Sequence, residues 1–294
     1  MRFWAFEKDG YHGLAVATAG GGMRGLLENQ AGHPGTLDAV LARGPGALEA
    51  AASALENGSP IDIEEIVLLP PLSARGKIIC VGLNYLDHAA ESSMKVPDYP
   101  TLFARFASSI IAHGAPMLRP VESERLDFEG ELVAVIGTAG RRIERANALS
   151  HIAGYSVFND GSVRDYQLRT PQWTMGKNFD GTGAFGPAFV TADELPPGAR
   201  GLRIQTRLNG HVVQSASTDD LIFDVASLVS LISAGITLEP GDLIVTGTPS
   251  GVGAVRTPPL FMKAGDVCEV EIERVGLLRN RVVDDAGAAQ AAAA

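Results

Sequence analysis

The apolar run Leu-Val-Ala-Val-Ile at residues 132–136, which is rich in branched side chains, predicts a buried β-strand. Glu129 and Glu131 stand two positions apart where this strand begins. Because residues two apart in a strand point to the same face, the two carboxylates are expected to face the same way. Neighbouring carboxylates repel each other, and a hard divalent cation such as Mg²⁺, Mn²⁺ or Ca²⁺ relieves that repulsion. Taken alone, the pair fits a solvated acidic strand end better, so the rest of the chain has to decide.

The size and charge of the chain narrow the classes of protein to which it can belong. Its 294 residues are 46% hydrophobic and 20% charged, which is ordinary for a soluble globular protein with one large and one small domain. The formal net charge of −10 argues against nucleic acid or an anionic membrane as the main partner. No apolar stretch has the length of a membrane span, and the first residues lack a signal-peptide pattern, so we expect a cytoplasmic protein. Cys80 and Cys268 lie in apolar runs and are expected in the core rather than in a disulfide.

Three segments are expected along the chain: a small N-terminal α/β domain over residues 1–72, a catalytic domain over 73–284 and a low-complexity tail over 285–294. Asp9-Gly10 predicts a hairpin turn near the start, and Pro70-Pro71 marks the first boundary. The elements expected in the N-terminal domain are the hairpin, two helices and a strand, over residues 2–18, 36–42, 46–56 and 61–69. No candidate chemistry lies in this domain.

From residue 76 onward the pattern changes to short strands separated by glycine and proline turns. Asn209-Gly210 is the strongest hairpin signal in the chain. The expected strands cover residues 77–82, 101–106, 109–111, 132–136, 152–159, 202–208, 212–215, 243–246 and 267–272, and the expected helices cover 85–93, 146–151 and 223–233. The glycine-rich segment 247–253 lacks the lysine of a phosphate-binding loop, so we expect no nucleotide site there. The hydroxyl of Thr248 can still meet an anionic substrate.

His88 and Glu91 form the first candidate catalytic pair. They stand three residues apart in a segment that is expected to be helical, so they share one helix face and can interact. A carboxylate on one imidazole nitrogen fixes the tautomer and leaves the other nitrogen free to take a proton from water. Taken alone, a surface histidine–glutamate pair is the more common arrangement.

Two further polar segments follow the apolar strands. The first carries Asp160, a third carboxylate, together with Arg164 and Gln167, which offer a fixed charge and an amide. The second is Gly-Lys-Asn-Phe-Asp at residues 176–180, in which Lys177 lies between a glycine and a tight turn and can face a pocket. Ordinary salt bridges at a strand end and a solvent-facing lysine are the alternatives.

Five motifs in this order resemble the fumarylacetoacetate hydrolase family over nearly the whole of residues 76–283. They are G-L-N-Y-x-x-H-A-x-E, D-F-E-x-E-L-x-x-V-I-G, N-D-x-S-x-R-D-x-Q, G-K-N-F-D and G-D-L-I-x-T-G-T-P-x-G-V-G. Several such motifs in series, with the family's order and spacing, make the resemblance specific. It implies an α+β, mainly β fold, a mixed β-sandwich roll with a small N-terminal α/β domain, that is commonly a homodimer.

The resemblance also implies a role for each candidate residue. Three carboxylates, those of Glu129, Glu131 and Asp160, correspond to the ligands of Mg²⁺ or Mn²⁺, and Ca²⁺ can take the site in crystals. His88 and Glu91 correspond to the dyad that activates water. Four further residues fall at family positions that contact the substrate or the negative charge that develops on it, namely Lys177, Arg164, Gln167 and Thr248.

Two positions depart from the family pattern. Arg105 stands where members usually have lysine, so the substrate contact expected there changes from a point charge to a planar fork. Gly161 follows the third carboxylate at a position that more often carries a branched residue.

These observations together predict a divalent-metal-dependent hydrolase that cleaves a carbon–carbon bond in a 2,4-dioxo acid, such as an acylpyruvate or a fumarylacetoacetate-like compound. The metal would hold the substrate's carboxylate and 2-oxo oxygen, and His88 would deprotonate the attacking water. Lys177, with Gln167, would stabilise negative charge on oxygen. The same site also suits an oxaloacetate decarboxylase, or an isomerase or hydratase of 2-hydroxymuconate-type acids. A binding protein without catalysis fits less well, because a binder needs no water-activating base.

Overall fold

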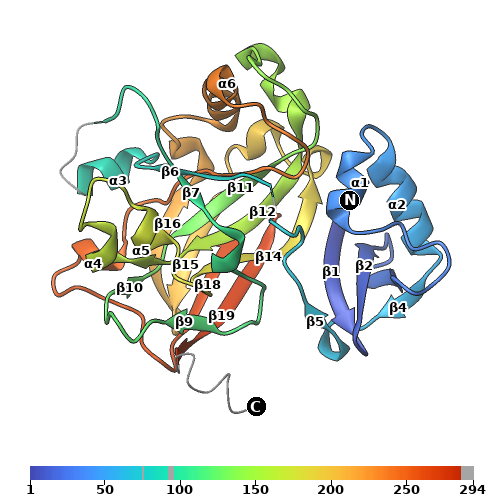
Figure 1. Cartoon of the computed structure of the whole chain (residues 1–294), viewed down its shortest axis with the longest axis horizontal. Helices are drawn as coiled ribbons and strands as arrows, with labels where there is room; N and C mark the ends of the chain where they lie inside the picture. Colours follow the sequence, from blue (N-terminus) through green and yellow to red (C-terminus); the bar gives the residue numbers. More distant parts are fainter. Residues whose placement is uncertain (75, 92–95, 286–294) are drawn as a thin grey trace.

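The structure is a computed structural model that describes residues 1–74, 76–91 and 96–285. The described residues form three β-sheets with short helices around them (Figure 1). The largest sheet has twelve strands, namely β1 (Arg2–Lys8), β2 (Tyr11–Ala17), β3 (Met23–Leu27), β4 (Ser59–Ile61), β5 (Val67–Leu68), β6 (Ile78–Gly82), β7 (Thr101–Arg105), β8 (Ile110–Ile111), β11 (Gly130–Ile136), β12 (Ile152–Asp160), β14 (Gly183–Thr191) and β17 (Leu243–Val245). The mainly β fold with mixed sheets confirms the predicted fold class.

A five-stranded sheet and a two-stranded ribbon complete the β-structure. The five-stranded sheet contains, in spatial order, β16 (His211–Ser217), β15 (Arg203–Leu208), β18 (Val267–Ile272), β19 (Gly276–Asp284) and β9 (Met117–Arg119). The ribbon pairs β10 (Leu126–Asp127) with β13 (Ser162–Val163). The helices are α1 (Leu37–Ala42), α2 (Ala47–Glu56), α3 (Leu86–Glu91), α4 (Arg164–Gln167), α5 (Thr174–Lys177) and α6 (Val225–Gly235). None of the helices in the described residues is long and apolar enough to cross a membrane.

Strand β11 is buried on both faces and joins two parts of the core. On one face Leu132 and Ala134 belong to a hydrophobic cluster that includes Val270 of the five-stranded sheet, so the two large sheets pack against each other. On the other face Val133 belongs to a cluster that includes Phe3 of the N-terminal segment. Two-sided burial explains why this run of the sequence is continuously apolar.

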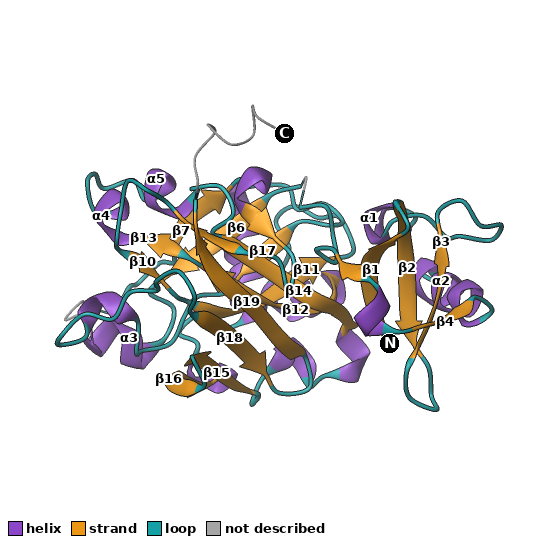
Figure 2. Ribbon diagram, turned by 90° about the horizontal axis from the view of Figure 1, so that it is seen from below, coloured by secondary structure: helices purple, strands orange, loops and turns teal. Residues whose placement is uncertain are grey.

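The N-terminal segment extends the largest sheet. Strand β1 pairs antiparallel with β14, with Arg2 opposite Val190 and Phe3 opposite Phe189. Figure 1 shows the segment as a smaller lobe beside β14, and Figure 2 shows the short helices α3, α4 and α5 at the opposite end of the molecule. A domain boundary near residue 72 stays a prediction, because the strands on its two sides share one sheet and one core.

Most predicted elements are present near their expected bounds. The hairpin at Asp9-Gly10 joins β1 to β2, and the side chain of Thr36 caps α1 by accepting from the amide of Ala39. Cys80 and Cys268 are free and buried, as expected. Ser92 and Ser93 of the helix predicted over 85–93, and residues 286–294 of the predicted tail, lie outside the described residues.

The structure differs from the sequence prediction at several points, and short strands such as β3, β9, β10 and β13 were not predicted. The strand expected over residues 61–69 is broken by a 3₁₀ turn, Ile63–Glu65, because the side chain of Asp62 caps the amide of Glu64. The short helix expected over 146–151 is present, as a 3₁₀ helix over Arg145–His151. Strand β14 was missed because Pro187 interrupts its pattern, and this proline lies where the register against β12 shifts, a place that tolerates it. Strand β19 was missed because its hairpin turns without an Asn-Gly signal, through Arg274 at φ 62°.

Candidate active site

Two neighbouring strands bring three carboxylates to one point. Glu129 directly precedes β11, Glu131 is its second residue, and Asp160 is the last residue of β12. The register places Glu131 opposite Phe158, and the amide of Asp160 donates to the carbonyl of Glu129 at 2.8 Å, so Glu129 and Asp160 are cross-strand neighbours. All three side chains therefore share one face of the sheet. One carboxylate oxygen from each lies within 4.8 Å of the others, and the residues are 5%, 1% and 0% exposed.

Lys177 lies between two of these carboxylates. Its Nζ atom is 2.6 Å from Oε2 of Glu129 and 2.6 Å from Oδ2 of Asp160. Lys177 is the last residue of α5, and Gly176 before it fits closely against Gln167, where a Cβ would lie 2.3 Å from a backbone nitrogen. A larger residue at position 176 would push α5 away from α4, so the glycine is needed to place the lysine.

Glu131 is compensated differently. It accepts a hydrogen bond from the backbone amide of Gly247. Within the described part of the chain, no lysine or arginine forms an ion pair with it, although it is 1% exposed. Burial, together with the negative charges of Asp160 and Glu129, raises the pKa of Glu131 well above its usual value.

The pKa of Glu129 is lowered and the pKa of Lys177 is raised, each against the effect of burial. Burial alone would raise the pKa of Glu129, but Lys177 and Arg164 outweigh it and hold that pKa below its usual value. Burial alone would lower the pKa of Lys177, but Asp160 and Glu129 outweigh it and raise that pKa. Lys177 is therefore a charged ammonium group at neutral pH, and it neutralises only part of the carboxylate charge.

The donor set fits a hard divalent cation. Its members are three buried carboxylates, with no histidine or cysteine in the group, which suits Mg²⁺ or Mn²⁺ better than zinc. The buried Glu131, without an ion-pair partner among the described residues, is the feature that such an ion would satisfy. Among the described residues, this is the one group of acidic, histidine or cysteine side chains close enough to hold a metal.

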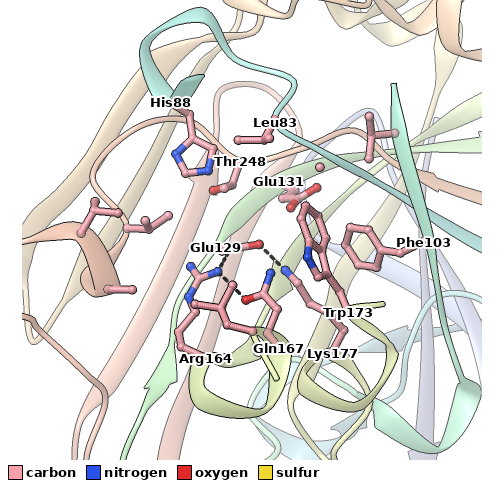
Figure 3. A pocket seen from close by; sticks show the side chains of 16 residues that line it. Leu83, His88, Phe103, Glu129, Glu131, Arg164, Gln167, Trp173, Lys177 and Thr248 are labelled. Atoms are coloured by element: carbon pink, nitrogen blue, oxygen red, sulfur yellow. Dashed lines mark hydrogen bonds and ion pairs between the residues drawn. The ribbon is translucent and has the colours of Figure 1, made fainter. Parts of the chain in front are cut away.

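A cavity of about 310 Å³ opens above the carboxylates (Figure 3). Phe103 and Trp173 form an apolar wall, with ring centroids 5.4 Å apart in an edge-to-face contact. Gly82 admits the indole, because a Cβ there would lie 2.3 Å from the Trp173 ring. The lining residues are Val81, Gly82, Leu83, His88, Phe103, Glu129, Glu131, Arg164, Gln167, Leu168, Trp173, Lys177, Thr248, Val252, Ala254 and Val255. Both a charged floor and an apolar wall are thus available to a small organic acid.

Arg164, Gln167 and Thr248 lie around this cavity, as predicted substrate contacts should. Nη1 of Arg164 is 2.7 Å from Oε1 of Glu129 and 2.9 Å from Oε1 of Gln167. Nη2 of Arg164 is buried and has no partner among the described residues. The hydroxyl of Thr248 donates to the carbonyl of Gly130 and accepts from Gln214. Nη2 of Arg164 is therefore an unused donor on a residue that lines the cavity.

His88 lies at the upper side of the cavity on α3 (Figure 3), and Glu91 is the last residue of the same helix. Nδ1 of His88 is 3.5 Å from Oε2 of Glu91, and this nitrogen has no hydrogen bond among the described residues. The carboxylate of Glu91 instead accepts from the amide of Gly251, at 2.9 Å to Oε2. The pair is therefore placed to interact but is longer than a hydrogen bond, as is common before a substrate is bound.

Arg105 lies behind the cluster and is not among the residues that line the cavity. Its guanidinium contacts Asp160, the carbonyl of Gly161, and the hydroxyls of Thr182 and Ser109. This position supports a role in orienting Asp160, in place of the substrate contact predicted from the sequence.

Three residues that shape the site were not predicted. Asp127 holds Arg164, Trp173 forms the cavity wall, and Gln214 holds Thr248. Asp127 had a sequence signal, because it precedes Glu129 by two positions at the start of the same motif. Gln214 had none, because it reaches the site through tertiary packing of a distant strand, whereas Trp173 lies four residues before Lys177 at the start of α5.

Comparison with known proteins finds relatives over most of the chain. The family described as Fumarylacetoacetate (FAA) hydrolase C-terminal matches residues 77–283. The mitochondrial oxaloacetate tautomerase Fahd2a of Rattus norvegicus is 40% identical over 266 residues, which cover 90% of this chain and 85% of that protein. The mitochondrial oxaloacetate tautomerase FAHD2A of Homo sapiens is 40% identical over 267 residues, with the same coverage.

Solved structures give a similar result. A fumarylacetoacetate hydrolase from Exiguobacterium antarcticum is 37% identical, with a TM-score of 0.85, over 97% of this chain and 100% of that chain. A 5-carboxymethyl-2-hydroxymuconate delta-isomerase from Mycobacterium smegmatis is 30% identical, with a TM-score of 0.75, over 97% and 100% of the two chains. The similarity therefore spans the N-terminal segment as well as the region of the five motifs.

Proposed function

Because the chain belongs to the fumarylacetoacetate hydrolase family, we propose that it is a divalent-metal-dependent tautomerase of a small 2-oxo diacid, with oxaloacetate as the substrate. The observation that carries the proposal is the buried carboxylate triad beside a cavity that Arg164 lines, with Nη2 of Arg164 buried and without a partner among the described residues. The names of the relatives support tautomerisation rather than the carbon–carbon hydrolysis expected from the sequence. The names of the two tautomerases also place those proteins in mitochondria, so a cytoplasmic location stays a prediction for this chain, as does the homodimer.

Tautomerisation requires only proton transfer at the site, whereas hydrolysis also requires an activated water molecule. In the direction from enol to keto form, O2 loses a proton and C3 gains one, the double bond moves from C2=C3 to C2=O2, and no carbon–carbon single bond breaks. The chemistry that a divalent cation bound to Glu129, Glu131 and Asp160 would supply is polarisation of the substrate's C1 carboxylate and 2-oxo oxygen.

Residues of this chain would perform the remaining tasks. Lys177 uses two of its three N–H groups on Glu129 and Asp160, and the third is available to hydrogen-bond O2. Arg164 offers Nη2 to the second carboxylate of a diacid. His88 lies at the upper side of the cavity, where its imidazole would deliver or remove the proton at C3.

Hydrolysis of a 2,4-dioxo acid is the second candidate, and the proximity of His88 to Glu91 favours it. A histidine 3.5 Å from a carboxylate suits activation of water, which tautomerisation does not consume. The structure of similar fold from Exiguobacterium antarcticum is described as a hydrolase. The same site would also allow decarboxylation of oxaloacetate.

Three assays on the purified chain, each with Mg²⁺ or Mn²⁺ added back after chelation, separate these reactions. They follow loss of the enol form of oxaloacetate, cleavage of acetylpyruvate, and release of carbon dioxide from oxaloacetate. We expect metal-dependent loss of the enol to be the fastest of the three reactions by about tenfold or more. A tenfold difference in rate corresponds to an activation free energy lower by about 1.4 kcal/mol. If cleavage of acetylpyruvate is the fastest, the hydrolase reading replaces the proposal, and release of carbon dioxide as the fastest reaction would favour a decarboxylase.

A further inference from the structure

Asp127 is a fully buried carboxylate that lies behind the cavity and forms no part of its lining. It is the last residue of β10 and stands opposite Ser162 of β13. Its carboxylate accepts four hydrogen bonds: from the amides of Phe128 and Gly253 at Oδ1, and from the amide of Ala254 and Nε of Arg164 at Oδ2. Each oxygen already accepts two hydrogen bonds, so neither is free to bind a ligand.

Asp127 fixes the orientation of Arg164. The guanidinium is planar. Its Nε atom lies 2.8 Å from Oδ2 of Asp127, and Nη1 contacts Glu129 and Gln167. Two edges anchored on different partners leave the plane of the group no freedom to rotate. Nη2 is then the remaining donor, buried and without a partner among the described residues.

The same carboxylate holds the wall of the cavity at residues 252–255. It accepts hydrogen bonds from the backbone amides of Gly253 and Ala254. The residues of this segment that line the cavity are Val252, Ala254 and Val255. Gly253 fits tightly, since a Cβ there would lie 1.8 Å from the carbonyl oxygen of Leu260 and 2.6 Å from Oδ1 of Asp127. One side chain therefore sets both the binding donor and the wall beside it.

We propose that Asp127 is a positioning residue that makes the site selective for 2-oxo diacids over monoacids, by holding the free edge of Arg164 toward the second carboxylate. This inference rests on the proposed function, in which Arg164 meets that carboxylate. Asp127 acts through Arg164, so removing either residue has the same effect on selectivity, and removing both adds nothing further.

Malate and lactate are suitable probes, because these unreactive 2-hydroxy acids differ by one carboxylate. Their dissociation constants for the Mn²⁺-loaded protein are measured by calorimetry for wild type, Asp127→Asn, Arg164→Lys and the double variant. We expect the preference of wild type for malate to fall by about tenfold or more in each single variant, the scale of one lost charge-assisted hydrogen bond, with no larger fall in the double variant. The dissociation constant for lactate is expected to change little.

Asp242→Asn is the matched control. Asp242 is also a buried carboxylate, 1% exposed, that accepts two backbone amides, those of Lys77 and Glu239, but it does not line the cavity. We expect this variant to lose stability as Asp127→Asn does and to keep the wild-type preference for malate. If Asp127→Asn fails to fold, Asp127→Glu, which keeps the charge and moves the carboxylate by one methylene, is expected to reduce the preference in the same direction.

Two results would overturn the inference: an unchanged malate preference in a folded Asp127 variant, or losses in the two single variants that add in the double variant. Because the preference is measured by binding, the absence of tautomerase activity in wild type would count against the proposed function alone.

Discussion

Nζ of Lys177 lies 2.6 Å from Oε2 of Glu129, inside a cluster that would hold a divalent cation. Lys177, Arg164 and Arg105 form ion pairs with Glu129 and Asp160, whereas Glu131 has no ion-pair partner in the described part of the chain. Fixed cationic side chains would thus compensate Glu129 and Asp160, and an exchangeable metal ion would compensate Glu131. The predictions below follow from this division.

Replacing Lys177 by Met is expected to destabilise the metal-free protein. Breaking a buried ion pair leaves uncompensated charge, which costs about 3–5 kcal/mol in the free energy of unfolding. Denaturant unfolding with and without Mn²⁺ measures the loss, and Mn²⁺ is expected to restore part of it. Lys8→Met, which removes the exposed ion pair with Glu65, is the control and should change stability little. Equal losses in the two variants would contradict the buried-pair interpretation.

Replacing Arg105 by Lys is expected to weaken metal binding more than substrate binding. Lysine keeps the charge but cannot reach Asp160, the carbonyl of Gly161 and Thr182 together, so Asp160 would be less well oriented. Loss of such a supporting contact typically costs about 10–100-fold in metal affinity. Calorimetric titration with Mn²⁺ checks this, together with KM at saturating metal. A raised KM with unchanged metal affinity would instead support the substrate contact predicted from the sequence.

Replacing His88 by Ala is expected to lower the rate of tautomerisation by about 10²–10⁴-fold, the usual contribution of a general acid or base. Affinity for Mn²⁺ should stay unchanged, because His88 is not a member of the carboxylate cluster. Any decarboxylation of oxaloacetate should be largely spared, since carbon dioxide leaves without proton transfer at C3 beforehand. Steady-state assays of both reactions on the same variant give the answer, and tautomerisation at the wild-type rate would rule out the proton-transfer role.

Two histidines outside the site predict a loss of stability at mildly acidic pH. Burial lowers the pKa of both His33 and His113, and Nδ1 of each accepts a backbone amide, from Gly35 and Arg279 respectively. The unfolded chain takes up protons at these side chains before the folded chain does, so their contribution to stability is present above the ordinary pKa of about 6.5 and is lost as pH falls through it.

Unfolding free energies measured between pH 7.5 and pH 5 check the histidine prediction. The double variant His33→Gln, His113→Gln is expected to show a shallower fall in stability than wild type. His211→Gln, at an exposed position, is the control and should keep the wild-type slope. An unchanged slope in the double variant would show that other groups cause the pH dependence.

The Glu129 and Glu131 pair could be predicted from the sequence because its geometry is local: alternation along one strand places both side chains on the same face. Asp160 was joined to them through the resemblance to the family, because it ends a different strand, β12, that pairs with β11. The supporting contacts could not be inferred in this way. Arg105 reaches Asp160 from β7, and Gln214 reaches Thr248 from the other large sheet, so both depend on how distant strands pack.

Irregular strands limited the prediction of the fold in the same manner. Strand β14 contains Gly183, Gly186 and Pro187, which suggest turns when considered locally, yet pairing on both sides keeps it extended. Gly183 also admits the Arg105 guanidinium, since a Cβ there would lie 2.7 Å from Nη2. The residues that hid this strand from the sequence prediction are thus among those that shape the site.

The rate of ketonisation of the enol form of oxaloacetate, measured against Mn²⁺ concentration for wild type and Glu131→Gln, tests the central claim most directly. Glutamine keeps an oxygen to accept the amide of Gly247 but removes the charge that a cation would bind. We expect chelated wild type to show only the uncatalysed rate and to recover fully with Mn²⁺, and Glu131→Gln to need about tenfold more Mn²⁺ or to stay inactive. Full activity of chelated wild type, or a wild-type response to Mn²⁺ in Glu131→Gln, would contradict a metal-dependent tautomerase at this triad.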